Sequence, residues 1–118
     1  MLQHQPALDL AFQALADPAR RAMVEKLCDG PASVSDLARP FEMSLSAVVQ
    51  HIAVLEGAGL IRTAKQGRVR TCHVEPQALR TVESWIAERR VLWERRLDRL
   101  GDYLKANPEM PKSNDSKE

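Results

Sequence analysis

The stretch that decides the fold is Met43 to Ile61, MSLSAVVQHIAVLEGAGLI. On a helical wheel at about 100° per residue, the apolar side chains within about 60° of Val48 are Leu45, Ile52 and Leu55. This stripe predicts a helix over 45–58 with one buried side. The opposite side carries small or uncharged residues, namely Ser46, Ala47, Gln50, Ala53 and Val54. A solvated helix would usually present Glu and Lys there, so we expect this face to contact a partner.

A second, shorter helix is expected immediately before this one. Ser33 followed by Asp36 resembles a capping box, and the proline that comes next should end or bend the helix. Ser44 is a suitable N-cap for the longer helix. Helices over 33–42 and 45–58, joined by a tight turn, have the geometry of a helix-turn-helix.

The segment after the helix-turn-helix has the pattern of a β-hairpin. Strands over 61–65 and 68–74 flank a Gln66–Gly67 turn. Between Leu45 and His73 the chain holds one acid and four basic residues, a local net charge of +3, whereas the whole chain carries only +1. The basic residues are Arg62, Lys65, Arg68 and Arg70. A basic hairpin after a helix-turn-helix indicates a wing that touches phosphate.

The flanking segments predict two helices before the helix-turn-helix and one long helix after it. The spacing predicts a helix over 7–15 and another that restarts at Asp17–Pro18, with Asp17 as its N-cap, and stops at Gly30–Pro31. The long helix, 76–105, would span roughly 40–45 Å, more than so small a domain covers, so its apolar seam should pack against a second copy. The residues expected in the dimer interface are Leu8, Phe12, Leu15, Ile86, Trp93, Leu97, Leu100 and Leu104.

Length and composition fit one domain, mostly α with a small β-hairpin. We assign residues 1–106 to a winged helix-turn-helix domain with a long C-terminal dimerisation helix. The polar, proline-containing segment 107–118 is expected to be a disordered tail. No apolar run approaches the roughly 20 residues of a membrane span, and the N-terminus has no signal-peptide pattern, so we expect a cytoplasmic protein without membrane contact.

Three stretches together resemble the ArsR/SmtB family of winged-helix bacterial repressors. They are LADPARRAMVEKL (Leu15 to Leu27), SDLARPFEMSLSAVVQHIAVLEGAGLI (Ser35 to Ile61) and QGRVRTCHV (Gln66 to Val74). A fourth stretch, WIAERRVLWERRLDRLGDYL, is similar to a subgroup whose last helix dimerises. The resemblance implies a homodimer that binds an inverted-repeat operator in double-stranded DNA and represses transcription. It also implies two recognition helices in successive major grooves, with the wings on the flanks.

The resemblance further implies which residues contact the operator. The family's base-reading positions fall on Ser46, Ala47, Gln50 and His51, and its wing contacts to phosphate or the minor groove fall on Lys65, Gln66, Arg68 and Arg70. The side-chain chemistry agrees, because Gln pairs bidentately with adenine, Ser bonds either base type, and Ala or Val packs on a thymine methyl group. His51 borders the outer face and is either a base reader, which we favour, or a residue that hydrogen-bonds the neighbouring backbone. Val49 stands where many relatives have a serine, so that backbone contact should be weaker or pass to Ser44.

No metal site or cofactor is predicted. Where the best-known family metal site has a CxC-type motif, this chain has Ser33 and Ser35, and a hydroxyl is a poor ligand for soft metals. A second family site uses His on the last helix, and no His follows His73. Cys28 and Cys72 lack CxxC spacing. Cys72 is expected to be a small buried hydrophobe of the wing, with thiol sensing as the alternative.

Two alternatives stay open at this stage, and the effector is unknown. Trp85 and Trp93 either pack in the dimer helix or line an effector pocket between helices. The chain either reads DNA or is a winged-helix module that binds protein, although the basic wing favours DNA. An enzyme is not expected, because Cys72 and His73 are adjacent strand residues that point to opposite faces, and no Gly-rich phosphate loop is present.

Overall fold

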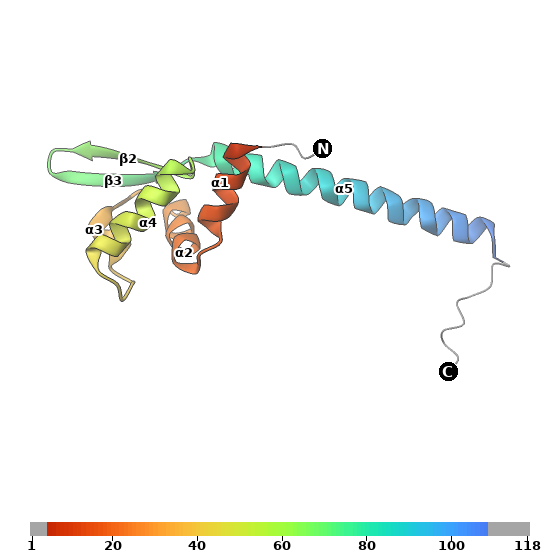
Figure 1. The fold of residues 1–118 in the computed structure, drawn as a ribbon, viewed down its shortest axis with the longest axis horizontal. Helices are drawn as coiled ribbons and strands as arrows, with labels where there is room; N and C mark the ends of the chain where they lie inside the picture. Colours follow the sequence, from red (N-terminus) through yellow and green to blue (C-terminus); the bar gives the residue numbers. More distant parts are fainter. Residues whose placement is uncertain (1–4, 109–118) are drawn as a thin grey trace. The chain divides into compact units, whose positions relative to one another are not determined.

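A computed structural model describes residues 5–108 of the chain, in two compact units that divide between Glu83 and Ser84. The elements in chain order are α1 (Pro6–Leu15), α2 (Pro18–Cys28), β1 (Ala32–Ser33), α3 (Val34–Ala38), α4 (Leu45–Gly57), β2 (Ile61–Gln66), β3 (Val69–Val74) and α5 (Pro76–Ala106) (Figure 1). Helices predominate, and one small antiparallel sheet belongs to the first unit. This arrangement confirms the predicted winged helix-turn-helix fold with a long C-terminal helix.

Three side-chain caps predicted from the sequence begin helices in the structure. The Asp17 carboxylate accepts two backbone N–H groups of the first turn of α2. Ser33 Oγ accepts from the N–H of Asp36 at α3, and Ser44 Oγ accepts from the N–H of Ala47 at α4. Each cap satisfies donors that have no partner within the helix, so the starts of these helices are set locally.

The first helix of the helix-turn-helix is shorter than expected. α3 ends at Ala38 and does not reach 42, because Pro40 has no N–H with which to continue the helical hydrogen bonds. α4 ends at Gly57, within one residue of the prediction. Gly59 follows with a φ of +76°, a backbone conformation that favours glycine. The two helices therefore keep the predicted order, but residues 39–44 connect them in place of the expected tight turn between 42 and 45.

The wing is part of a three-stranded sheet in the order β1-β3-β2, one strand more than predicted. β2 and β3 are antiparallel with Gln66 opposite Val69, so Gly67 and Arg68 form a two-residue turn at the tip, at the left of Figure 1. Gly67 has a φ of +64°, as the first central residue of a tight hairpin turn requires. β1 adds a short antiparallel pairing on the other edge of β3. Its two residues are too few to give a strand pattern in the sequence.

The core of the first unit lies between its helices and the inner face of the sheet. Its largest fully buried side chains are Met23, Leu27, Leu37, Val48, Leu55, Leu60, Ile61 and Cys72. Val48, Ile52 and Leu55 form the buried stripe of α4, as predicted. The prediction for Leu45 is wrong, because its side chain is 58% exposed. Leu45 begins α4, one turn before Val48, where the core has already ended.

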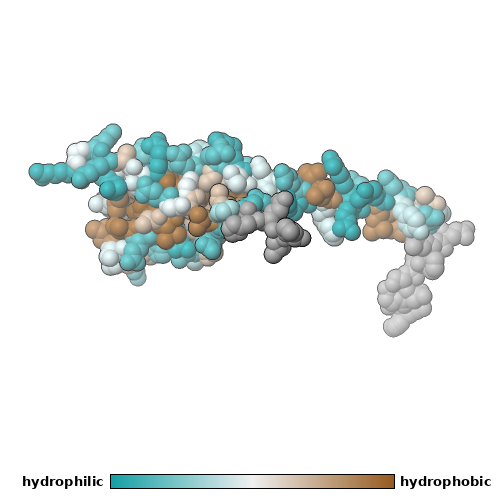
Figure 2. Space-filling view, turned by 45° about the horizontal axis from the view of Figure 1, so that its top comes forward, coloured by the Kyte–Doolittle hydropathy of each residue, from teal (hydrophilic) through white to brown (hydrophobic). Residues whose placement is uncertain are grey.

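α5 differs from the other long helices because none of its residues is buried in the single chain. Near its start, Ala78 and Leu79 pack against the core of the first unit. From Ile86 onward its large apolar side chains are exposed, and Figure 2 shows them as separate hydrophobic patches among hydrophilic side chains. No helix within the described residues is long and apolar enough to cross a membrane. Of the predicted tail, residues 109–118 lie outside the described residues.

Candidate nucleic-acid interface

The outer face of α4 consists of small or uncharged side chains. Ser46 and Gln50 are exposed, and Ala47 and His51 are half-buried beside them. Val54 extends the face, with 44% of its surface exposed. Within residues 5–108, the Ser46 hydroxyl and the Gln50 amide have no hydrogen-bond partner. Both groups therefore keep their full hydrogen-bonding capacity for a molecule that contacts this face.

Ser44 lies at the N-terminus of the same helix and already has a structural task. Its Oγ accepts the Ala47 N–H at 3.1 Å, although the residue itself is exposed. A hydroxyl both accepts and donates, so the Ser44 hydrogen stays available for a phosphate oxygen. The cap and the predicted phosphate contact are therefore compatible.

His51 has a partner inside the chain that the sequence did not reveal. Its Nδ1 lies 3.2 Å from Nη1 of Arg20, a residue of α2. Arg20 also donates through Nε to the Ala14 carbonyl at 2.7 Å and through Nη2 to the Gln13 carbonyl at 3.1 Å. One guanidinium thus ties the C-terminus of α1 and the outer border of α4 to α2. The two residues are 31 positions apart in the sequence, so no local sequence pattern indicates their contact.

Asp17 completes this junction of α1, α2 and α4. Its Oδ2 lies 3.8 Å from Arg20 Nη1, while its Oδ1 accepts the two N–H groups of the cap. Burial raises the pKa of the Asp17 carboxyl, but the backbone N–H donors of Arg20 and Ala19 and the positive charge of the Arg20 guanidinium outweigh it. The pKa of Asp17 therefore lies below its ordinary value, and the carboxylate stays charged under neutral conditions.

The tip of the wing presents two unpaired cations. Lys65, Gln66 and Arg68 are all exposed, and within residues 5–108 none of their three side chains has a hydrogen-bond or ion-pair partner. In Figure 2 hydrophilic side chains cover the end of the hairpin. Because Arg68 lies in the tight turn and Lys65 lies close to it on β2, the two cations form a compact positive group suited to phosphate.

The other two arginines of the wing are engaged within the chain. Arg70 Nη1 donates to Thr63 Oγ1 at 2.8 Å, and the Thr63 hydroxyl and N–H both donate to Glu56 Oε2, at 3.1 and 3.3 Å. Arg62 pairs with Glu75, with 2.9 Å between Nε and Oε2. Thr63 and Glu56 thus link the wing to α4, a role the sequence prediction missed. Arg70 keeps further donors for phosphate, but its position is set by the fold.

The two cysteines are free thiols in different surroundings. Cys28 is exposed and Cys72 is fully buried in the core, as predicted for Cys72. Burial raises the pKa of the Cys72 thiol, the Glu56 carboxylate raises it further, and Arg70 offsets part of the rise. A buried, protonated thiol is a poor nucleophile, so the geometry favours packing over thiol sensing.

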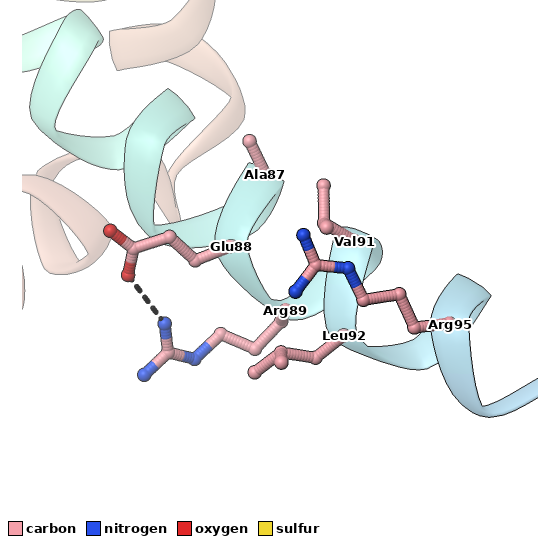
Figure 3. A pocket seen from close by; sticks show the side chains of 6 residues that line it. All are labelled: Ala87, Glu88, Arg89, Val91, Leu92 and Arg95. Atoms are coloured by element: carbon pink, nitrogen blue, oxygen red, sulfur yellow. Dashed lines mark hydrogen bonds and ion pairs between the residues drawn. The ribbon is translucent and has the colours of Figure 1, made fainter.

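The described part of the chain gathers no metal-binding cluster, and its groove along α5 is not a ligand pocket. Among residues 5–108, no three His, Cys, Asp or Glu side chains gather closely enough to hold a metal ion. A shallow groove in the second unit is lined by Ala87, Glu88, Arg89, Val91, Leu92 and Arg95 (Figure 3). All six residues belong to α5, so the groove lacks the opposing walls of a ligand pocket. Neither Trp85 nor Trp93 lines it, and the Arg89 guanidinium lies 4.6 Å from the centre of the Trp85 ring.

The residues predicted for a dimer interface differ in how far they are buried in the single chain. Leu8 is only 6% exposed and Leu15 packs against the core, so both already serve the fold of the single chain. Phe12 is 38% exposed. The α5 residues are exposed by 47% to 59%, and they are Ile86, Trp93, Leu97, Leu100 and Leu104. Spacings of three, four and seven residues place the α5 group on one side of the helix.

Comparisons with known proteins agree with this geometry. A family model described as bacterial regulatory protein, arsR family, matches residues 17–63. Over 71 residues, the chain is 45% identical to the HTH-type transcriptional regulator Rv2034 of Mycobacterium tuberculosis. This match covers 60% of this chain and 66% of that protein. It is 30% identical over 57 residues to the transcriptional repressor SdpR of Bacillus subtilis, covering 48% and 63%. The matched region thus spans slightly less than two thirds of the length of these curated relatives.

A solved structure resembles the chain over more of its length. The crystal structure of an ArsR family transcriptional regulator, RHA00566, is similar with a TM-score of 0.74 and 53% sequence identity. The similarity covers 80% of this chain and 97% of that one. All three proteins are named as transcriptional regulators or repressors and not as enzymes, in agreement with the sequence prediction.

Proposed function

The chain belongs to the ArsR family of bacterial regulatory proteins, and from this premise we propose that it is a homodimeric repressor that binds an inverted-repeat DNA operator. The observation that carries the proposal is the pairing of two surfaces in the first unit. The outer face of α4 offers uncharged hydrogen-bonding groups without partners, and the wing tip offers unpaired cations. Bases are read by the first kind of group and phosphates are held by the second.

Base reading is assigned to α4 as the recognition helix. Its diameter fits the major groove, where Gln50 is suited to bond adenine N6 and N7 together. Ser46 bonds either a donor or an acceptor on the base edge, and the Ala47 methyl group packs on thymine. These side chains carry no charge, so they distinguish bases without adding non-specific attraction to the backbone.

Backbone binding is assigned mainly to the wing. Lys65 and Arg68 have no internal partner among the described residues, and Gln66 lies between them with a free amide. Arg70 contributes the donors that Thr63 does not occupy. The Ser44 hydroxyl adds one contact at the N-terminus of α4, where the helix dipole also favours a phosphate.

The operator contact requires two chains. The exposed apolar side chains of α5 provide a seam for a second copy, with Phe12 as an added contribution from α1. A two-fold dimer places its two recognition helices one helical turn of DNA apart, about 34–36 Å, and thereby reads an inverted repeat. The bound dimer represses transcription if it covers promoter DNA and excludes polymerase. This function places the protein in the cytoplasm.

Fluorescence anisotropy with labelled DNA from upstream of the protein's own gene tests the proposal. Scrambled DNA of equal length is the control, and each titration is repeated at about 50 and 200 mM salt. We expect tight, selective binding at two chains per site that weakens steeply with salt, because phosphate contacts release counterions. Weak binding that is equal for both DNAs and insensitive to salt would contradict this mechanism at that site and favour a protein-binding module.

A further inference from the structure

Resting on the proposed function, we infer that Arg20 is a positioning residue that fixes the tautomer of His51. In this tautomer His51 presents a single N–H donor to the major groove and selects a base edge that offers an acceptor. Arg20 would thus influence operator specificity from α2, through a side chain of the recognition helix.

The tautomer follows from the chemistry of the contact. An arginine side chain carries N–H donors and has no acceptor. Nη1 of Arg20 lies 3.2 Å from Nδ1 of His51, so Nδ1 must be the acceptor in a hydrogen bond between them. In a neutral imidazole the remaining proton is then on Nε2.

Arg20 is held in place independently of His51. Its Nε and Nη2 donate to two carbonyls in the last turn of α1, those of Ala14 and Gln13, and Asp17 Oδ2 lies 3.8 Å from its Nη1. Only 18% of the side chain is exposed. Because the guanidinium is fixed on three sides, His51 adapts to Arg20 and not the reverse.

The fixed tautomer has a definite consequence at the groove. His51 is half-buried on the border of the outer face, and within residues 5–108 its Nε2 has no partner. An Nε2–H donor suits guanine O6 or N7, adenine N7 or thymine O4, and it repels the cytosine amino group. The other tautomer would present an acceptor at Nε2, and it would favour a base edge that offers a donor, such as the cytosine amino group.

Ring-nitrogen NMR on the full chain tests the tautomer directly. Long-range ¹H–¹⁵N correlation distinguishes protonated from unprotonated ring nitrogens, and the loss of signals in His51→Gln assigns them. At about pH 8.5 we expect a proton on Nε2 and none on Nδ1 in the wild type, and a mixture of tautomers in Arg20→Gln. A proton on Nδ1 in the wild type, or an unchanged ring state in a folded Arg20→Gln variant, would overturn the inference.

Base selection tests the consequence with two near-isosteric variants. His51→Asn keeps an acceptor near the Nδ1 position for Arg20 and removes the outer donor, whereas His51→Gln places an amide donor near the Nε2 position. Against single-base operator variants, we expect His51→Asn to lose roughly 2- to 10-fold of discrimination at one base pair, the value of one hydrogen bond. His51→Gln should retain the preference for an acceptor. Equal discrimination by both variants and the wild type would overturn the inference.

A double-substitution cycle separates positioning from a merely structural role. If Arg20 acts through His51, Arg20→Gln should alter discrimination in the wild-type background and have no further effect when His51 is already Ala. An equal loss in both backgrounds would contradict the inference. Should Arg20→Gln fail to fold by circular dichroism, the wild-type ring state and the two His51 variants still decide the question. Wild-type protein that binds no DNA selectively would refute the proposed function, while the ring nitrogens would still report the tautomer.

Discussion

α4, the proposed recognition helix, and the wing present different chemistry to the same expected partner. α4 exposes Ser46 and Gln50, which are uncharged and rest on a buried apolar stripe. The wing exposes Lys65 and Arg68 at the tip of its hairpin, away from Ile61 and Cys72, the hairpin residues that are buried in the core. The difference separates two tasks: a rigid helix can place hydrogen-bonding groups accurately against base edges, whereas a cation on a hairpin tip needs only proximity to phosphate.

The largest expected effect comes from removing the proposed second copy, on which operator binding by both surfaces would depend. Leu97→Glu with Leu104→Glu places charges on the proposed α5 seam, so we expect a monomer in sedimentation analysis. Operator affinity should fall by about 100-fold or more, because the second half-site is no longer bound intramolecularly. Leu92→Glu is the control, since Leu92 is at least as exposed as Leu97 and Leu104 but lies on another side of α5. A double variant that remained dimeric would place the interface elsewhere.

The next largest effect tests base reading by α4 alone. Gln50→Ala should cost about 1–3 kcal/mol at one base pair, roughly 5- to 150-fold in affinity, and leave the other positions unchanged. Anisotropy against a panel of single-base operator variants measures this directly. Discrimination equal to that of the wild type at every position would mean that α4 presents a different face to DNA.

A smaller effect tests phosphate binding by the wing, through a comparison of two of its arginines. Arg68→Ala should weaken binding to all sequences alike and flatten the slope of log affinity against log salt by about 0.9, the contribution of one phosphate contact. Arg62→Ala is the control, because Arg62 is already paired with Glu75 and should change the slope less. Equal slopes for the two variants would show that the unpaired state of Arg68 has no importance for binding.

The smallest effect concerns the junction beneath α4 and leaves the wing untouched. The pKa of Asp17 is lower in the folded chain than its ordinary value of 3.8. Its stabilising contribution is therefore complete above pH 3.8 and is lost as the pH falls through the lower folded value. Asp17→Asn should make urea stability fall less steeply with acid below pH 4 than in the wild type. The same acid dependence in both proteins would contradict this assignment.

The sequence predicts those features whose cause is local. The helix over 45–58 follows from its apolar spacing, its start from Ser44, and the hairpin turn from Gly67. Leu45 was misassigned because periodicity locates a face but not the point at which the neighbouring core ends. The two-residue strand β1 forms only because β3 lies beside it. Its prediction requires the tertiary fold.

The candidate site divides in the same way. Residue type and spacing located the uncharged face of α4 and the cations of the wing. They could not show that Arg20 holds His51 across 31 residues, or that Arg70 is tied through Thr63 to Glu56. These contacts are decided by how α1, α2, α4 and the sheet pack. The contacts show which of several similar side chains already have a hydrogen-bond or ion-pair partner within the chain.

The division of tasks between helix and wing is tested most directly by a crossed measurement on one operator. The ratio of operator to scrambled-DNA affinity, and the salt slope, are determined together for wild type, Gln50→Ala and Arg68→Ala. We expect Gln50→Ala to lower the ratio and keep the slope, and Arg68→Ala to lower the slope and keep the ratio. If both variants changed the ratio and the slope together, base reading and phosphate binding would not be separate tasks of the two surfaces.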